Sequence, residues 1–166
     1  MKPERSAPVL PKRDTGVRSA NDEVDLYRMT AKPPEGTACP KCKASFHNGR
    51  WTWQQAEKDA HEVVCPACHR INDQFPAGYL TIRGEFFKEH RDEIIHLIEN
   101  HEKKEKAARP LQRIMAIAET REGTEVTTTD SHLARVIAEA LHDAYKGDLK
   151  LKYSRDENLL RASWKR

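Results

Sequence analysis

The sequence predicts an α+β protein in which a small cysteine-containing module precedes an antiparallel-rich sheet with helices on one face. Three observations lead to this prediction. All four cysteines lie between residues 39 and 68. From Tyr79 onward, short segments with alternating apolar residues are separated by two longer segments with helical spacing. With 166 residues, of which 37% are hydrophobic, the chain has room for one modest core and a small satellite module.

Residues 1–36 are predicted to be a disordered, mildly basic tail followed by a linker. Pro3, Pro8 and Pro11 stand among several Lys and Arg residues and few apolar ones, a composition that buries too little surface to fold alone. The run Pro33-Pro34-Glu35-Gly36 then separates this tail from the cysteine module. Two interpretations stay open: a solvated terminus without a role, or a tail that orders on an anionic partner.

The cysteine module, predicted over residues 37–78, contains two Cys-Pro-Xaa-Cys pairs. Two sulfurs so spaced can reach one ion from a tight turn, and a second such turn completes the tetrahedron that Zn²⁺ prefers. A closed sulfur shell leaves no position for water, so we expect a structural Cys₄ zinc ribbon. Fe in place of Zn, and a redox dithiol pair, are the alternatives. The predicted ligands are Cys39, Cys42, Cys65 and Cys68.

Residues 79–166 are predicted to form a domain with the element order β-α-β-β-α-β-β, a split βαβ arrangement with an extra strand. The strand "YLTIRG" precedes a helical segment that ends before Pro110. Two strands follow, joined at Gly123, which can adopt the positive φ of a tight hairpin. The next helix is expected to start at Thr129 or Asp130 and to end near Gly147. Its apolar positions are Leu133, Val136, Ile137, Ala140, Leu141 and Ala144.

The chain closes with a predicted hairpin over residues 148–166 that has one buried and one basic face. Residues 146–166 hold seven basic and three acidic side chains, whereas the whole chain has a net charge of only +3. Period-2 geometry separates the two kinds of side chain. The expected buried face contains Leu149, Leu151, Tyr153, Leu160, Ala162 and Trp164. The expected basic face contains Lys150, Lys152, Arg161 and Lys165.

Several function classes find no support in the sequence. No apolar run approaches the roughly 20 residues that cross a bilayer, and no apolar stretch of signal-peptide length opens the chain. We therefore expect a cytoplasmic protein without a membrane partner. We find no Gly-rich phosphate loop and no Gly-Xaa-Ser-Xaa-Gly motif, and "HEVVC" lacks the second His of a metalloprotease. We expect no enzymatic activity and no small-molecule substrate.

The segments "CPKC", "CPACHR", "FPAGYLTIRG" and "VTTTDSHLARVIAEALHDAYKGDLKLKYS" resemble a known family. Over about residues 39–165 the chain is similar to the N-terminal half of the large-ribosomal-subunit export adaptor (nonsense-mediated-decay-protein-three-like) family, which has short bacterial members. The chain departs from the pattern in its single Cys₄ set, in Lys43 and His69 where knuckles commonly place Gly, and in lacking the export regions. The resemblance implies zinc binding by the four cysteines and, by analogy, a ribosomal partner.

Two hypotheses for function follow. The first is an RNA- or ribosome-binding zinc protein that associates with ribosomal RNA or the large ribosomal subunit through a basic sheet face. The second is a zinc-stapled adaptor that binds another protein through Glu119, Glu122 and Glu125 or through Trp51 and Trp53. Either tryptophan could instead cover the metal site. The predicted RNA-binding residues are Lys150, Lys152, Arg161, Lys165, Arg166, Lys41, Lys43, Arg50 and Trp51.

Overall fold

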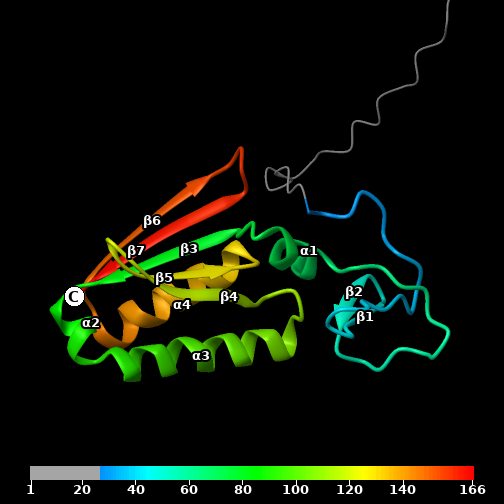
Figure 1. Ribbon diagram of the computed structural model, residues 1–166, viewed down its shortest axis with the longest axis horizontal. Helices are drawn as coiled ribbons and strands as arrows, with labels where there is room; N and C mark the ends of the chain where they lie inside the picture. Colours follow the sequence, from blue (N-terminus) through cyan, green and yellow to red (C-terminus); the bar gives the residue numbers. More distant parts are fainter. Residues whose placement is uncertain (1–26) are drawn as a thin grey trace, which may run out of the picture.

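The computed structural model describes residues 27–166, and within them the chain forms four helices and two sheets (Figure 1). The α+β class is therefore confirmed. The predicted tail lies mostly outside the described residues. The elements are β1 (Ser45–His47), β2 (Arg50–Thr52), α1 (Pro66–Asp73), β3 (Gly78–Arg83), α2 (Glu85–Glu89), α3 (Arg91–Ala108), β4 (Ile114–Thr120), β5 (Gly123–Thr128), α4 (Ser131–Tyr145), β6 (Asp148–Ser154) and β7 (Leu159–Lys165).

The larger sheet has the strand order β4-β5-β3-β7-β6. Strand β3 lies at its centre, antiparallel to β5 and parallel to β7, while β4–β5 and β6–β7 are antiparallel hairpins. Gly123 opens β5 with a φ of 140°, and a Cβ there would lie 2.3 Å from the Ile82 carbonyl oxygen. Only glycine fits this close approach of the hairpin to β3.

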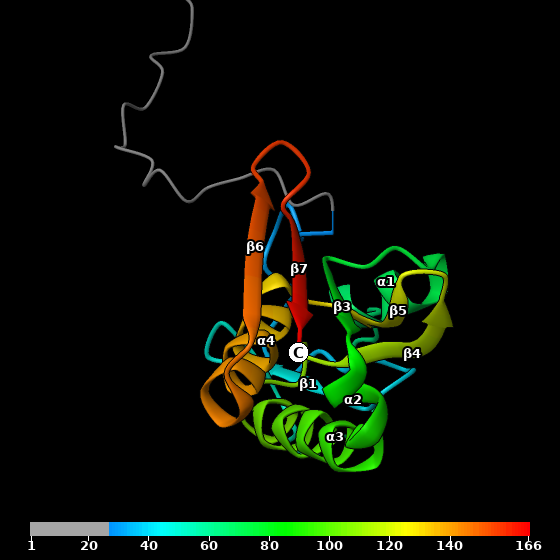
Figure 2. The same cartoon turned by 90° about the vertical axis from the view of Figure 1, so that its left-hand side faces the viewer.

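Helices α3 and α4 cover the same face of the larger sheet (Figure 2). The Asp130 side chain caps α4 by accepting a hydrogen bond of 3.0 Å from the Leu133 backbone N–H. The segment expected to form one helix after β3 divides at His90 (φ −114°, ψ 22°) into α2 and α3. The core between helices and sheet consists of Leu80, Ile82, Phe87, Ile94, Ile98, Val126, Leu133, Ile137, Ala138, Leu141, Ala162 and Trp164.

The β6–β7 hairpin is less covered than predicted. Leu160, Ala162 and Trp164 of β7 are buried as expected, but Leu151 and Tyr153 of β6 are 42% and 43% exposed. Strand β6 lies at the sheet edge and its hairpin projects beyond the end of α4 (Figure 1). The alternation therefore predicts the correct side for these two residues. The prediction that they are buried is wrong, because none of the helices within residues 27–166 reaches that part of the strand.

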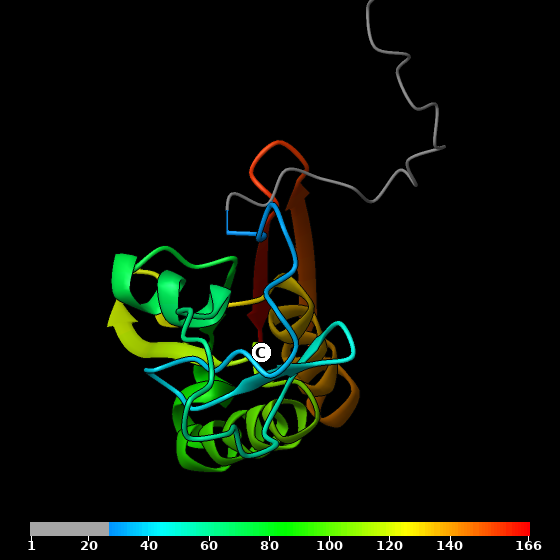
Figure 3. The same ribbon diagram turned by 90° about the vertical axis from the view of Figure 1, so that its right-hand side faces the viewer.

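The cysteine module lies at one end of the larger sheet and has its own small cluster of buried residues (Figure 3). Hairpin β1–β2 and helix α1 are its regular elements, and Phe46 packs edge-to-face on Trp51 with ring centroids 5.7 Å apart. The preceding linker belongs to the module, since the Gly36 backbone N–H donates to the Phe46 carbonyl at 2.7 Å. Glu35 contacts His47 at 3.1 Å.

Candidate metal centre

The four cysteines converge on one point. Their sulfur atoms all lie within 4.8 Å of one another, and the Cys42 and Cys65 sulfurs are 3.8 Å apart. A tetrahedron with metal–sulfur bonds of about 2.3 Å has edges of about 3.8 Å, so this separation is consistent with a four-coordinate ion such as Zn²⁺. All four thiols are free rather than joined as disulfides. Cys39, Cys42, Cys65 and Cys68 are thus positioned to hold a metal ion.

The first cysteine pair lies in a tight turn before β1. The Cys39 backbone N–H donates to the Ala44 carbonyl at 2.8 Å, and the Lys43 N–H donates to the Cys39 carbonyl at 3.0 Å. Closing this turn requires a left-handed residue, and Lys43 adopts a φ of 67°. Glycine is common at such a position because a side chain is strained there. The departure noted in the sequence is therefore accommodated by a strained lysine.

The second pair opens helix α1. Cys65 is the N-cap, its sulfur accepts from the Cys68 backbone N–H at 3.4 Å, and Pro66 takes the first helical position. His69 continues this helix, so no glycine is needed after Cys68. The Cys65 backbone N–H also donates to the Cys39 sulfur at 3.4 Å, which ties the two pairs together.

Arg113, between α3 and β4, contacts the cysteine cluster and is not among the site residues predicted from the sequence. Its guanidinium donates to the sulfurs of Cys42 at 3.1 Å, Cys68 at 3.3 Å and Cys65 at 3.5 Å. Its Nε donates to the Pro110 carbonyl at 2.7 Å, which fixes the side chain. Arg113 is only 7% exposed. A buried cation against three sulfurs would offset the negative charge of four thiolates around a metal ion.

The thiols of the centre change one another's pKa values. A hydrogen bond with Cys65 lowers the pKa of Cys42 to about 4, and the nearby charge of Arg113 adds to this effect. The same hydrogen bond and burial raise the pKa of Cys65, and burial raises that of Cys68. Burial alone would lower the pKa of Arg113, but its contacts with Cys68, Cys42 and Cys65 raise it. The Cys42 thiol therefore ionises before the Cys65 thiol, and binding of a metal ion would displace the proton that remains.

The two tryptophans have different surroundings. Trp51 is 9% exposed and belongs to the buried cluster of the module, so its ring is not accessible to a stacking base. Trp53 donates from Nε1 to the Lys106 carbonyl at 2.7 Å, and the Arg113 guanidinium lies 5.8 Å from its ring centroid. Trp53 and Arg113 thus join the cysteine module to the domain that contains the larger sheet.

The predicted RNA-binding residues fall into separate groups. Lys150, Lys152, Arg161 and Lys165 share the face of the larger sheet opposite α3 and α4, as the strand register shows. Arg166 does not join them, because it donates to the Tyr145 carbonyl and stacks on Phe86, with 4.2 Å from the guanidinium to the ring centroid. Lys41 and Lys43 precede β1 and Arg50 opens β2, so these three exposed residues belong to the cysteine module and not to the larger sheet.

The face of the larger sheet opposite α3 and α4, here called the helix-free face, contains further residues that were not predicted to bind RNA. Tyr79 and Arg83 on β3 lie beside Arg161 and Lys165 on β7. The Arg161 guanidinium lies 4.6 Å from the Tyr79 ring centroid. A groove of about 400 Å³ runs over this face and is lined in part by Tyr79, Lys150 and Lys152. The alternation in "YLTIRG" marks Tyr79 and Arg83 as one face, but only the β3–β7 pairing places them next to the basic hairpin.

No protein-family model, no curated protein and no solved structure matches this chain. None of the helices within residues 27–166 combines the length and apolar character that a membrane span needs.

Proposed function

We propose that this chain is a zinc-containing RNA-binding protein that contacts RNA through the helix-free face of its larger sheet. The observation that supports this most strongly is the pairing of like charges across strands. Lys152 lies directly opposite Arg161, and Arg83 lies directly opposite Lys165, whose neighbour on the other side is Asp148. Like charges in opposite positions destabilise a sheet, and a bound polyanion relieves that repulsion.

The acidic side chains on the same face do not cancel this charge. Asp148 and Glu125 lie at strand positions of this face and Glu122 lines the groove over it, against five basic side chains. Asp148 contacts Lys150 at 3.7 Å, which is a weak interaction between exposed groups. The five basic side chains are Arg83, Lys150, Lys152, Arg161 and Lys165.

Tyr79 favours a single-stranded over a double-helical ligand. Its ring lies on the central strand of the face, next to Arg161. Aromatic side chains on an open sheet stack with unpaired bases while neighbouring Lys and Arg bind phosphates. A duplex keeps its bases stacked within the helix, so Tyr79 would have no role with such a ligand.

In this proposal the metal is Zn²⁺ and its role is structural. Cysteine thiolates in a tetrahedral set suit zinc, and four protein sulfurs fill its coordination shell. The metal stabilises a module whose buried cluster is small, because its binding energy becomes folding energy. The chemistry that zinc supplies here is a fixed cross-link between the turn before β1 and the start of α1.

The resemblance to the large-subunit export adaptor family makes large-subunit ribosomal RNA the first natural RNA to test. The general test compares two double variants that each remove two positive charges. Lys150→Ala/Lys152→Ala removes charges from the sheet face, whereas Lys103→Ala/Lys104→Ala removes exposed charges from α3. Fluorescence anisotropy with labelled single-stranded RNA, over a range of salt concentrations, measures affinity and its salt dependence.

We expect the sheet-face variant to bind more weakly and to lower the logarithmic salt slope by about 1.4, since each phosphate contact in a single strand contributes about 0.7. The α3 variant should retain the wild-type slope. Equal losses of affinity in both variants would show that binding depends only on the net charge of the protein. Absence of wild-type binding at low salt would refute the proposed function.

A protein-binding role is the second candidate, because β6 offers an exposed edge. Within residues 27–166, no strand pairs with the outer edge of β6. Leu151 and Tyr153 of this strand are also exposed. Such an edge can accept a strand of another protein. Purification of complexes from cells with and without nuclease separates the candidates, since nuclease should remove only partners that are bound through RNA.

A further inference from the structure

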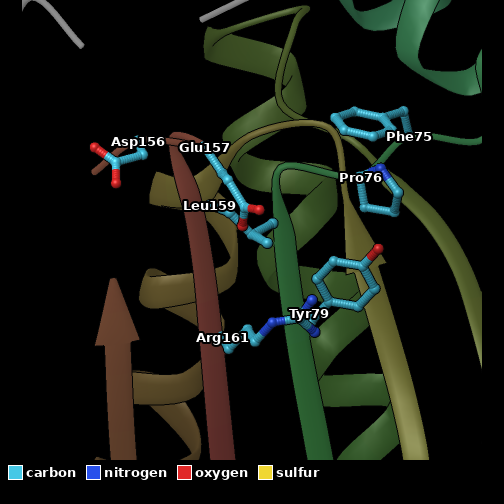
Figure 4. A pocket seen from close by; sticks show the side chains of 7 residues that line it. All are labelled: Phe75, Pro76, Tyr79, Asp156, Glu157, Leu159 and Arg161. Carbon is cyan, nitrogen blue, oxygen red and sulfur yellow. The ribbon is translucent and has the colours of Figure 1, made fainter. Parts of the chain in front are cut away.

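We infer that the pocket at one end of the helix-free face is a nucleobase site that selects guanine, an inference that rests on the proposed RNA binding. The pocket has a volume of about 410 Å³, within the range of small-molecule sites. It lies between the segment that joins α1 to β3 and the turn that joins β6 to β7 (Figure 4). Its lining residues are Phe75, Pro76, Tyr79, Asp156, Glu157, Leu159 and Arg161.

The aromatic side chains supply surfaces on which a base can stack. Phe75 is 50% exposed, and its backbone is held in place by two hydrogen bonds. Its backbone N–H donates to the Arg70 carbonyl at 3.0 Å, and its own carbonyl accepts from Arg70 Nη1 at 3.0 Å. Tyr27 stacks on the Phe75 ring with centroids 5.8 Å apart. A fixed, exposed ring binds a base with little loss of conformational entropy.

Arg161 links the pocket to the phosphate-binding face. It lines both this pocket and the groove that contains Lys150 and Lys152. A strand that follows the groove can thus place its phosphates against the lysines and turn one base toward Phe75 and Tyr79. Arg161 is then positioned for the phosphate next to that base.

Glu157 supplies the selectivity for guanine over adenine. Figure 4 shows its side chain extending along the pocket beside Leu159, whereas Asp156 points away. Neither carboxylate forms an ion pair with another residue in the described part of the chain. A carboxylate only accepts hydrogen bonds. Guanine presents two adjacent donors, N1–H and the N2 amino group, on its Watson–Crick edge, while adenine presents an acceptor at N1. Glu157 therefore favours guanine and disfavours adenine.

The test measures binding of labelled oligouridylate strands that carry a single central guanine or a single central adenine. We expect wild-type protein to bind the guanine strand about tenfold more tightly. Glu157→Gln should reduce this preference to less than about twofold, because an amide places a donor against a guanine donor. Asp156→Asn removes the same charge from the adjacent residue and should retain the preference. Phe75→Ala should lower the affinity for both strands about tenfold, because the base loses its stacking partner.

Competition with GMP distinguishes a free nucleotide from a base within RNA. Weak competition by GMP supports recognition within a strand, and competition as strong as that of the guanine strand assigns the pocket to a free nucleotide. Equal binding of both strands, unaffected by Glu157→Gln, would overturn the guanine pocket and leave the proposed RNA binding intact. Failure of all strands to bind would refute the proposed function as well.

Discussion

The guanidinium of Arg113 gives the clearest quantitative prediction about the metal centre. Arg113→Met removes the charge and three contacts to sulfur, at 3.1, 3.3 and 3.5 Å, while retaining an unbranched apolar stem. Loss of a group that orients and neutralises metal ligands typically lowers metal affinity about 10–100-fold. This corresponds to about 1.4–2.8 kcal/mol. We expect Zn²⁺ affinity to fall within this range.

Competition with a chromophoric zinc chelator at pH 7 measures the affinity. Arg109→Met is the matched control, since Arg109 lies four residues earlier, is exposed and contacts Glu105 rather than sulfur. It should bind zinc like the wild type. Arg113→Lys should fall between the two, because a single ammonium group cannot replace a guanidinium fork that reaches three sulfurs. Wild-type zinc affinity in Arg113→Met, with an unchanged circular dichroism spectrum, would refute the role assigned to Arg113.

Three further predictions concern the metal and the fold. Protein purified without added metal should contain about one equivalent of zinc with four sulfur ligands at about 2.3 Å by X-ray absorption; less than about a third of an equivalent, together with stable disulfides, would contradict this. Cys65→Ser should abolish hydrogen-exchange protection in residues 37–73 while β3 and α4 stay protected, because the two regions have separate buried clusters; loss over the whole chain would show one cooperative unit. Asp130→Ala should lower the free energy of unfolding by about 1 kcal/mol through loss of the α4 cap, and an unchanged denaturation midpoint would count against the cap.

Local sequence patterns predicted those features that depend on nearby residues. Asp130 precedes an apolar helical repeat, and both the cap and the buried positions Leu133, Ile137 and Leu141 are present in α4. The first cysteine pair lies in a tight turn and the second at the start of α1, so the spacing within each pair predicted two sulfurs close together. In such cases the interacting groups are separated by few residues or by a fixed repeat.

Features that depend on distant segments could not be predicted in this way. Arg113 contacts the Cys42 sulfur across 71 positions of the chain, and its neighbours show no periodic pattern. Alternation in β6 assigns Leu151 to the helix-covered side of the sheet but cannot tell how far α4 extends. The break at His90 has no proline or glycine to announce it. The pocket proposed to bind guanine likewise requires the β3–β7 pairing, which brings Tyr79 next to Arg161.

Ultraviolet cross-linking of the protein to RNA in cells, followed by mass spectrometry of the cross-linked peptides, tests the central proposal most directly. The proposed function predicts nucleotides attached to peptides from β3, which contains Tyr79, and from the β6–β7 hairpin, residues 148–165. The same experiment identifies the cross-linked RNA and thereby tests the large-subunit assignment. Cross-links confined to the cysteine module or to α3, or no cross-links at all, would contradict binding through the helix-free sheet face.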